Sequence, residues 1–170
     1  MSETETLSPV LPDDIEAMAR RVLKRACDTE RALATAESCT GGLLASLLTD
    51  VEGCSSAFER GFVTYSHDAK CELLGLARDM VEQCHAVSRE VAVAMAQGAL
   101  NASHADVAVA VTGFAGRGAP EDEPGLVHFG CARRDGETIH REEHFGDIGR
   151  GPTRIAAIRV ALELFEEALS

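Results

Sequence analysis

The segment 35–48 holds the residues best suited to chemistry. At positions 37–42 it reads ESCTGG, between a short apolar stretch and an apolar helical pattern, which predicts a sharp strand-to-helix turn. Ser38 at such a bend would lie beside backbone N–H groups that no helical hydrogen bond uses. Those amides could hold a phosphate, or the oxyanion that forms when a hydroxyl attacks a carbonyl. Ser38 or Thr40 could instead simply cap the helix, and the local sequence leaves both interpretations open.

A serine nucleophile needs a base, and the segment 65–70 offers one. Tyr65 closes a predicted strand over 62–65, and Lys70 lies about one turn into a helix predicted over 68–74. The turn between them could direct both side chains into one cleft, where a partly desolvated lysine has a lowered pKa and can act as a neutral base. Alternatively, the segment has no catalytic role: Lys70 is exposed, Tyr65 lies at the edge of the core and His67 is solvated.

Histidines and arginines near the C-terminus are weaker candidates. Residues 140–144 read HREEH, which matches a zinc-peptidase string that requires a helix. This segment is predicted to be a strand, where four residues span about 13 Å, too far for His140 and His144 to share one zinc. Arg150 and Arg154, one helical turn apart, suit phosphate or carboxylate capture, with solvated surface charge as the alternative. The acidic loop 120–124 could be a lid or a plain surface turn.

The remaining pattern indicates one layered α/β domain. Residues 1–11 are predicted to be a flexible N-terminus and residues 12–170 a single domain. Helices are predicted from Pro12, after Gly42, from Ser88 and along 155–169, and strands over 31–36 and 107–111, with a hairpin of 126–133 and 138–145 around Asp135-Gly136. Helices alternate with strands and one hairpin is added, which predicts a mixed sheet.

Composition excludes several classes of partner. The net charge is −12 over 170 residues, which disfavours nucleic acid and anionic membranes. The first residues lack a signal-peptide pattern and no apolar run reaches membrane-spanning length, so we expect a cytoplasmic protein. The six cysteines contain no C-x-x-C pair, and we interpret them as small, reduced, mostly buried residues.

The motifs quoted above occur in an order that resembles a known family. The stretches that carry the likeness are TAESCTGG (35–42), FERGFVTYS (58–66) continuing to Ala69-Lys70, AVS (86–88) and AVTG (110–113). From about residue 12 onward, the sequence is similar to the CinA C-terminal domain family, the nicotinamide-nucleotide amidohydrolases. The resemblance implies a three-layer α/β/α fold. It also implies hydrolysis of the carboxamide of nicotinamide mononucleotide to nicotinate mononucleotide and ammonia, within pyridine nucleotide recycling for NAD synthesis.

The resemblance also implies roles for individual residues. Ser38 falls on the family's nucleophile, Lys70 on its base and Tyr65 on an assisting tyrosine. The substrate-binding positions would be Thr40, Gly41, Gly42, Thr112, Gly113, Arg150 and Arg154. The scheme uses no metal and no cofactor. The expected partners are a small nucleotide substrate and further copies of the chain, in a homodimer or a higher homo-oligomer. The family also occurs fused to a larger N-terminal partner, whose activities we do not expect here.

Some positions depart from the family pattern. His67 stands where asparagine is usual, Arg117 replaces a proline, and residues 146–150 read GDIGR, as if two residues were inserted into Gly-Asp-Arg. These changes spare the proposed Ser, Tyr and Lys but alter the walls of the site. They leave two alternatives open: a non-catalytic member that binds a nucleotide or a protein partner in DNA uptake or damage responses, and an amidase for another substrate.

Overall fold

The computed structural model describes residues 11–170 and contains a five-stranded sheet in the order β2-β1-β3-β4-β5. The strands are β1 (Leu33–Glu37), β2 (Phe58–Val63), β3 (Val107–Gly113), β4 (Leu126–Arg133) and β5 (Ile139–His144). β1 pairs in parallel with both β2 and β3, whereas β4 and β5 add to β3 as an antiparallel hairpin. The mixed sheet predicted from the sequence is therefore confirmed.

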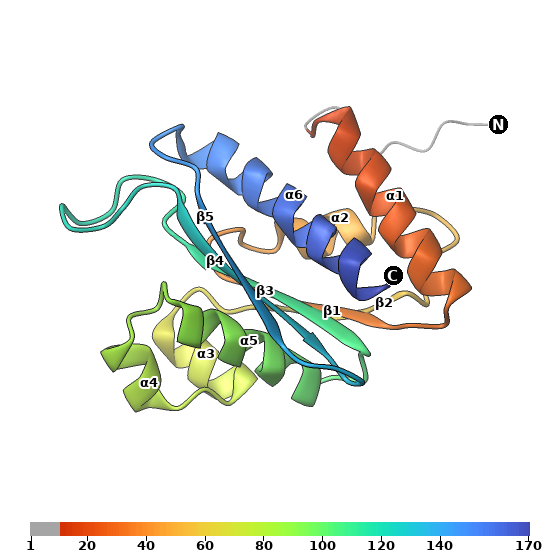
Figure 1. Cartoon of the computed structure of the whole chain (residues 1–170), viewed down its shortest axis with the longest axis horizontal. Coiled ribbons are helices and arrows are strands. Elements are labelled where there is room, and N and C mark those ends of the chain that lie inside the picture. Colours follow the sequence, from red (N-terminus) through yellow and green to blue (C-terminus); the bar gives the residue numbers. More distant parts are fainter. Residues whose placement is uncertain (1–10) are drawn as a thin grey trace.

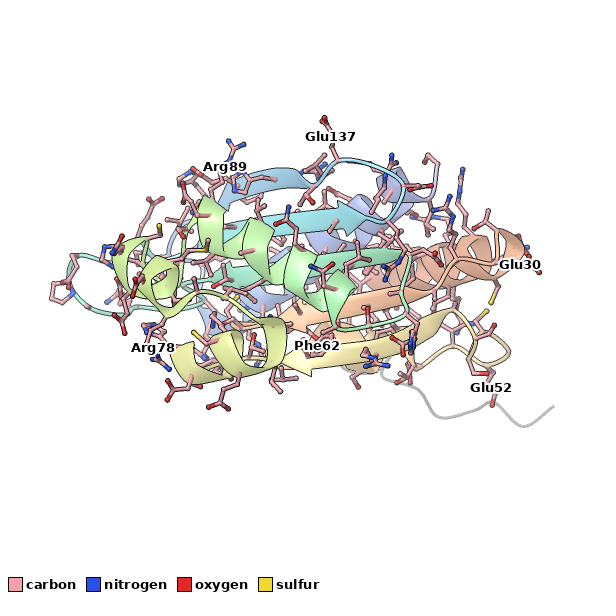
Figure 2. The ribbon with its side chains drawn as sticks, turned by 90° about the horizontal axis from the view of Figure 1, so that it is seen from below. Glu30, Glu52, Phe62, Arg78, Arg89 and Glu137 are labelled. Carbon is pink, nitrogen blue, oxygen red and sulfur yellow. The ribbon has the colours of Figure 1, made fainter. Side chains whose placement is uncertain are left out.

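Helices cover both faces of the sheet (Figure 1). They are α1 (Asp13–Asp28), α2 (Leu43–Leu48), α3 (His67–Leu74), α4 (Arg78–Gln83), α5 (Arg89–Asn101) and α6 (Arg150–Ala168). α1, α2 and α6 pack on one face, and α3, α4 and α5 on the other, as Figures 1 and 2 show from two directions. This is the three-layer α/β/α sandwich that the family resemblance implies.

β3 lies in the middle of the sheet and contributes to both cores. Val107, Val109 and Val111 pack with α1, α2 and α6, while Ala108 and Ala110 pack with α3, α4 and α5. A continuous apolar run is what a strand buried on both faces needs. The alanine face is small because α5 approaches the sheet closely there.

The crossovers position the ends of the parallel strands. The chain leaves β1 through α2 on one face to reach β2, then returns through α3, α4 and α5 on the other face to reach β3. The direction of winding therefore reverses between β1 and β3. Open α/β sheets bind ligands beyond the carboxyl ends of the strands at such a reversal.

Several sequence-based boundaries need correction. β1 extends through Glu37 rather than ending at residue 36, and β2 spans 58–63 rather than 62–65. Tyr65 consequently lies beyond the strand, because the amide of Thr64 makes the last bond to β1, donating to the Glu37 carbonyl at 2.8 Å. The short helix α4 was not predicted, since it is six residues long and shows no clear helical periodicity.

Other local predictions are confirmed. Ser88 caps α5, its hydroxyl accepting from the Val91 amide at 3.3 Å, and Arg150 begins α6. Residues 1–10 of the predicted flexible N-terminus lie outside the described residues, but Leu11, the last residue of that predicted segment, is buried in the core. Within 11–170 no helix combines the length and apolar character needed to cross a membrane.

Candidate active site

Ser38 and Lys70 meet at the carboxyl ends of the parallel strands. Ser38 is the first residue after β1, and Lys70 lies on α3, which follows β2. The Lys70 Nζ donates a hydrogen bond to the Ser38 Oγ at 3.0 Å. α3 starts at a serine cap, where the Ser66 hydroxyl accepts from the Ala69 amide at 3.0 Å. The fold therefore brings the turn that carries Ser38 and the helix that carries Lys70 together, as the sequence analysis predicted.

Lys70 is a buried amine without a carboxylate partner among residues 11–170. Its side chain is fully inaccessible to solvent, and besides Ser38 its Nζ donates to the Thr64 carbonyl at 2.7 Å. Burial lowers the pKa of Lys70 because desolvation disfavours the charged ammonium, an effect that the nearby Cys39 and Cys71 thiols oppose. An amine in this setting is biased toward its neutral form, which can accept a proton.

The turn after β1 is held by Glu37, a residue that sequence reasoning did not single out. Glu37 is fully buried, and its carboxylate accepts from the amides of Leu44 at 2.8 Å and Ala45 at 3.0 Å. It therefore satisfies two of the N–H groups at the start of α2. An acidic residue directly before the serine, in an otherwise apolar strand, was the available signal.

Gly41 and Gly42 allow the chain to bend behind the serine. Their φ angles are +59° and +94°, a left-handed conformation that residues with a Cβ rarely adopt. A Cβ on Gly42 would also lie 3.2 Å from the Val63 side chain. Backbone geometry alone therefore requires glycine at these two positions, whether or not a ligand approaches them.

The turn amides are not all available to an anion. Ser38 N donates to the Val111 carbonyl at 2.9 Å, and Gly41 N donates to the Ser38 carbonyl at 3.1 Å. Among the described residues, the amides of Thr40 and Gly42 donate no hydrogen bond, whereas the Cys39 amide faces its own thiol. Of the turn amides that the sequence suggested as oxyanion donors, those of Thr40 and Gly42 are therefore unoccupied.

Arg154 supports the turn from α6. Its Nη2 donates to the Thr40 carbonyl at 2.8 Å, while its Nε is buried without a partner. Thr40 itself is fully buried, and its hydroxyl makes no hydrogen bond. At least one donor of Arg154 is therefore engaged inside the protein, and this arginine holds the backbone beside Ser38.

A cleft of about 290 Å³ opens above Ser38. Tyr65 and Arg150 form part of its wall, and the Arg150 Nη2 donates to the Tyr65 hydroxyl at 3.1 Å. Tyr65 is 64% exposed, and its hydroxyl contacts Arg150 rather than the serine or the lysine. Arg117 lines the same cleft and forms an ion pair with Asp147 at 2.6 Å.

Thr112 and Gly113 are the last two residues of β3. The Thr112 hydroxyl donates to the Ala86 carbonyl at 2.6 Å, so it tethers the loop before α5. Gly113 lines the cleft, and a Cβ there would come within 2.8 Å of the Leu126 carbonyl. Gly113 thus keeps β3 and β4 in register at the rim of the site.

A second cleft of about 530 Å³ adjoins the first, with Val87 and Phe114 in both walls. Its far side is the acidic loop, through Glu121, Asp122 and Glu123. The loop is tied to the hairpin because His144 Nδ1 lies 2.6 Å from a Glu123 carboxylate oxygen. The arrangement places a negatively charged wall next to a cleft that contains two arginines.

The protein is a three-layer α/β protein with a serine hydroxyl hydrogen-bonded to a buried amine. This pair lies where the winding of the sheet reverses, and its chemistry suits attack on a carbonyl group. The model of the CinA C-terminal domain matches residues 15–169. The chain belongs to this family.

Individual relatives agree with this assignment. A protein named nicotinamide-nucleotide amidohydrolase PncC from Enterobacter agglomerans is 48% identical over 75% of the chain and 79% of its own length. The protein of the same name from Escherichia coli K12 is also 48% identical, over 76% of the chain and 79% of its own length. A CinA-like protein from Leptospira borgpetersenii is 39% identical over 93% of the chain, which spans only 37% of that longer relative.

Solved structures share the fold. The competence/damage inducible protein CihA from Agrobacterium tumefaciens superposes with a TM-score of 0.89 at 46% identity, covering 94% of this chain and 97% of its own. A CinA superfamily protein from Escherichia coli gives a TM-score of 0.85 at 31% identity, covering 97% and 99%.

Proposed function

We propose that the protein hydrolyses the carboxamide of nicotinamide mononucleotide by a Ser38–Lys70 mechanism. The observation that carries the proposal is the 3.0 Å contact between the Ser38 Oγ and the Nζ of a buried lysine. The names of the relatives from Enterobacter agglomerans and Escherichia coli supply the substrate. A neutral amine at this distance lies within reach of the hydroxyl proton, as general-base catalysis requires.

The reaction proceeds in two halves. Lys70 accepts the Ser38 proton as the Ser38 Oγ bonds to the amide carbon, and the carbonyl oxygen becomes an oxyanion facing the turn amides. When the tetrahedral intermediate collapses, the carbon–nitrogen bond breaks and the Lys70 ammonium returns its proton to the leaving ammonia. Water then attacks the ester while Lys70 accepts its proton. The bond from the acyl carbon to Ser38 Oγ breaks, Lys70 returns the proton to Ser38 Oγ, and the carboxylic acid is released.

The substrate phosphate is assigned to the arginine side of the cleft. Arg150 and Arg117 both line it, and guanidinium groups bind phosphate through paired N–H donors. Tyr65, bonded to Arg150 at 3.1 Å, would position that arginine and close the wall over the bound nucleotide. Arg154 keeps the turn in place through Thr40 rather than contacting the phosphate.

Ammonia release from nicotinamide mononucleotide tests the proposal. Ser38→Ala should lower kcat by roughly 10³-fold or more, because the nucleophile is lost. Ser46→Ala is the matched control, since Ser46 is an exposed serine on α2, and it should retain full activity. A covalent acyl group on the peptide containing Ser38, trapped by rapid acid quench and detected by mass spectrometry, would support the nucleophile directly.

The possible outcomes separate the alternatives. Full activity in Ser38→Ala would show that the nucleophile is wrong. Absence of turnover in the wild type with measurable nucleotide binding would favour a non-catalytic binding protein. Turnover of another carboxamide alone would retain the mechanism but replace the substrate.

A further inference from the structure

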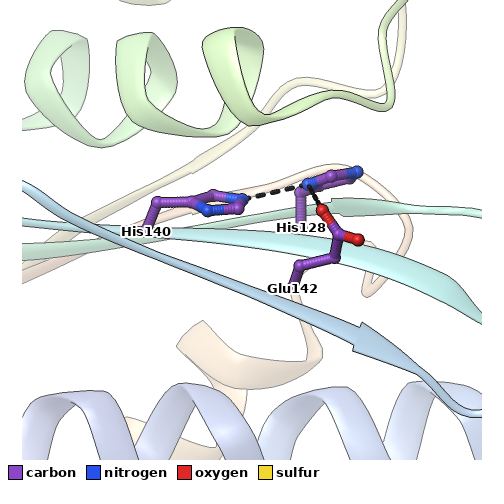
Figure 3. A group of neighbouring side chains, drawn as sticks. All are labelled: His128, His140 and Glu142. Carbon is purple, nitrogen blue, oxygen red and sulfur yellow. Dashed lines mark hydrogen bonds and ion pairs between the residues drawn. The ribbon is translucent and has the colours of Figure 1, made fainter.

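The antiparallel hairpin carries a second polar cluster, formed by His128, His140 and Glu142 (Figure 3). In the register of β4 and β5, His128 lies opposite Glu142, and His140 lies opposite Gly130. Alternate residues of a strand point to the same face, so all three side chains project from one face of the hairpin. Figure 3 shows them between the hairpin and the start of α5.

The donor atoms of the cluster have the spacing of metal ligands. His128 Nδ1 lies 3.0 Å from His140 Nε2 and 3.5 Å from Glu142 Oε2, and the three donor atoms lie within 4.8 Å of one another. A tetrahedral zinc ion bound at about 2.0–2.2 Å sets its ligand atoms roughly 3.3–3.5 Å apart. Small side-chain rotations would therefore bring all three atoms onto one ion.

The cluster has a rigid base and an open side. His128 is 7% exposed, whereas Glu142 is exposed on the edge strand β5, which leaves a path for an ion and water. The other carboxylate oxygen of Glu142 lies 2.7 Å from His144 Nε2. That contact orients the carboxylate and leaves Oε2 facing the histidines, as outer partners of metal ligands do.

The surroundings favour a cation at this point. From the first turn of α5, Glu90 adds negative charge near both rings, while Arg89 opposes it near His140.

We propose that His128, His140 and Glu142 bind one divalent transition-metal ion, with Zn²⁺ the best match, at a site separate from the Ser38–Lys70 pair. Two imidazoles and one carboxylate suit zinc and its neighbours, whereas Mg²⁺ and Ca²⁺ prefer all-oxygen sites. Solvent would fill the fourth position. The bound ion would cross-link β4 to β5 beneath α5 and stabilise the folded chain by binding it preferentially.

Zinc titration of the metal-free full-length chain tests the site. Competition against a chromophoric chelator should give one Zn²⁺ per chain, and the Tm should rise with zinc concentration. Co²⁺ as a second probe should give visible absorption typical of a nitrogen- and oxygen-ligated ion. The measurement needs no turnover, so its result is independent of the proposed amidohydrolase activity.

Variants locate the ion. His140→Ala and Glu142→Gln change partly or fully exposed side chains, so folding should be retained. Each should weaken zinc binding by more than the roughly 10- to 100-fold that loss of an outer-shell partner costs. His104→Ala is the matched control, because His104 is also beside a carboxylate, 3.8 Å from Glu59, but outside the cluster.

Two results would overturn the proposal. One is a wild-type chain that binds no zinc, which would leave the 3.0 Å contact as a hydrogen bond between two histidines. The other is zinc binding that is unchanged in His140→Ala and Glu142→Gln, which would place the ion elsewhere, for instance on the free thiols.

Discussion

The parallel and antiparallel halves of the sheet each present a polar cluster, but the two clusters are assembled differently. In the parallel half, Ser38 follows β1 and Lys70 follows β2. They meet because these two strands are parallel neighbours, so both strand-to-helix turns lie at the same edge of the sheet. In the antiparallel half, His128, His140 and Glu142 belong to one hairpin, and strand register alone brings them together.

Their electrostatics differ as well. Lys70 is a potential cation buried without an opposing carboxylate among the described residues, so its neutral form is favoured. The histidine cluster keeps a carboxylate, Glu142, within 3.5 Å of His128. Lys70 thus has no counter-charge among the described residues, whereas the two imidazoles have a carboxylate beside them.

Removal of the lysine amine should produce the largest effect. Lys70→Met is expected to lower kcat for nicotinamide mononucleotide by roughly 10³-fold or more, as loss of a base acting with its nucleophile does. Its unfolding free energy should change by less than about 2 kcal/mol, because two lost hydrogen bonds are offset by removal of a buried amine. Steady-state kinetics and urea denaturation measure the two effects. Near-wild-type turnover would refute the role of Lys70.

The pH dependence of activity and of stability tests whether the pKa of Lys70 is lowered. kcat/KM should rise with pH as Lys70 deprotonates and level off below the ordinary lysine pKa of 10.5, because burial lowers the folded-state value. Between the folded and unfolded pKa values the unfolded chain binds more protons, so this contribution to stability grows as pH rises and is lost as pH falls.

Both consequences can be measured on one pair of proteins. A pH–rate profile gives the first, and denaturation at a series of pH values for wild type and Lys70→Met gives the second. An acid limb of the rate profile centred at or above 10.5 would contradict the lowered pKa.

Gly130 tests the antiparallel half. A Cβ at this position would lie 2.3 Å from the Ala92 carbonyl of α5, so Gly130→Ala must push the helix from the sheet. We expect a loss of about 1–3 kcal/mol in unfolding free energy, together with weaker zinc binding next to it. Gly151→Ala is the control, since a Cβ there meets nothing within 4 Å. Equal stability of the two variants would show that α5 has room to adapt.

Arg154 gives the smallest expected effect. Arg154→Gln removes the 2.8 Å bond to the Thr40 carbonyl and should cost about 1–2 kcal/mol, with a fall in kcat as the turn beside Ser38 loosens. Arg159→Gln, which breaks only a surface pair with Asp14 on α1, should cost less than about 1 kcal/mol and leave kcat unchanged. A rise in KM alone for Arg154→Gln would indicate a direct substrate contact instead.

The sequence was sufficient where a local pattern has one physical meaning. The apolar run 107–111 predicts a strand, and residues 107–113 do form the buried strand β3. The ESCTGG segment predicts a sharp turn, and Gly42 within it adopts a φ of +94°. The strand predicted over residues 138–145 is also present, as β5. These conclusions rest on spacing along the chain, which is independent of what packs against it.

Tertiary structure decided which partners these residues meet. Nothing in the segment 65–70 distinguishes a buried lysine from an exposed one, because burial of Lys70 depends on how α3 packs against the sheet. Likewise His128 joins His140 and Glu142 only through the β4–β5 register, and Arg154 engages Thr40 only because α6 crosses that turn. The sequence determines the chemical type of each side chain. The pKa values, ligand sets and hydrogen-bond partners depend on contacts between residues that are distant in sequence.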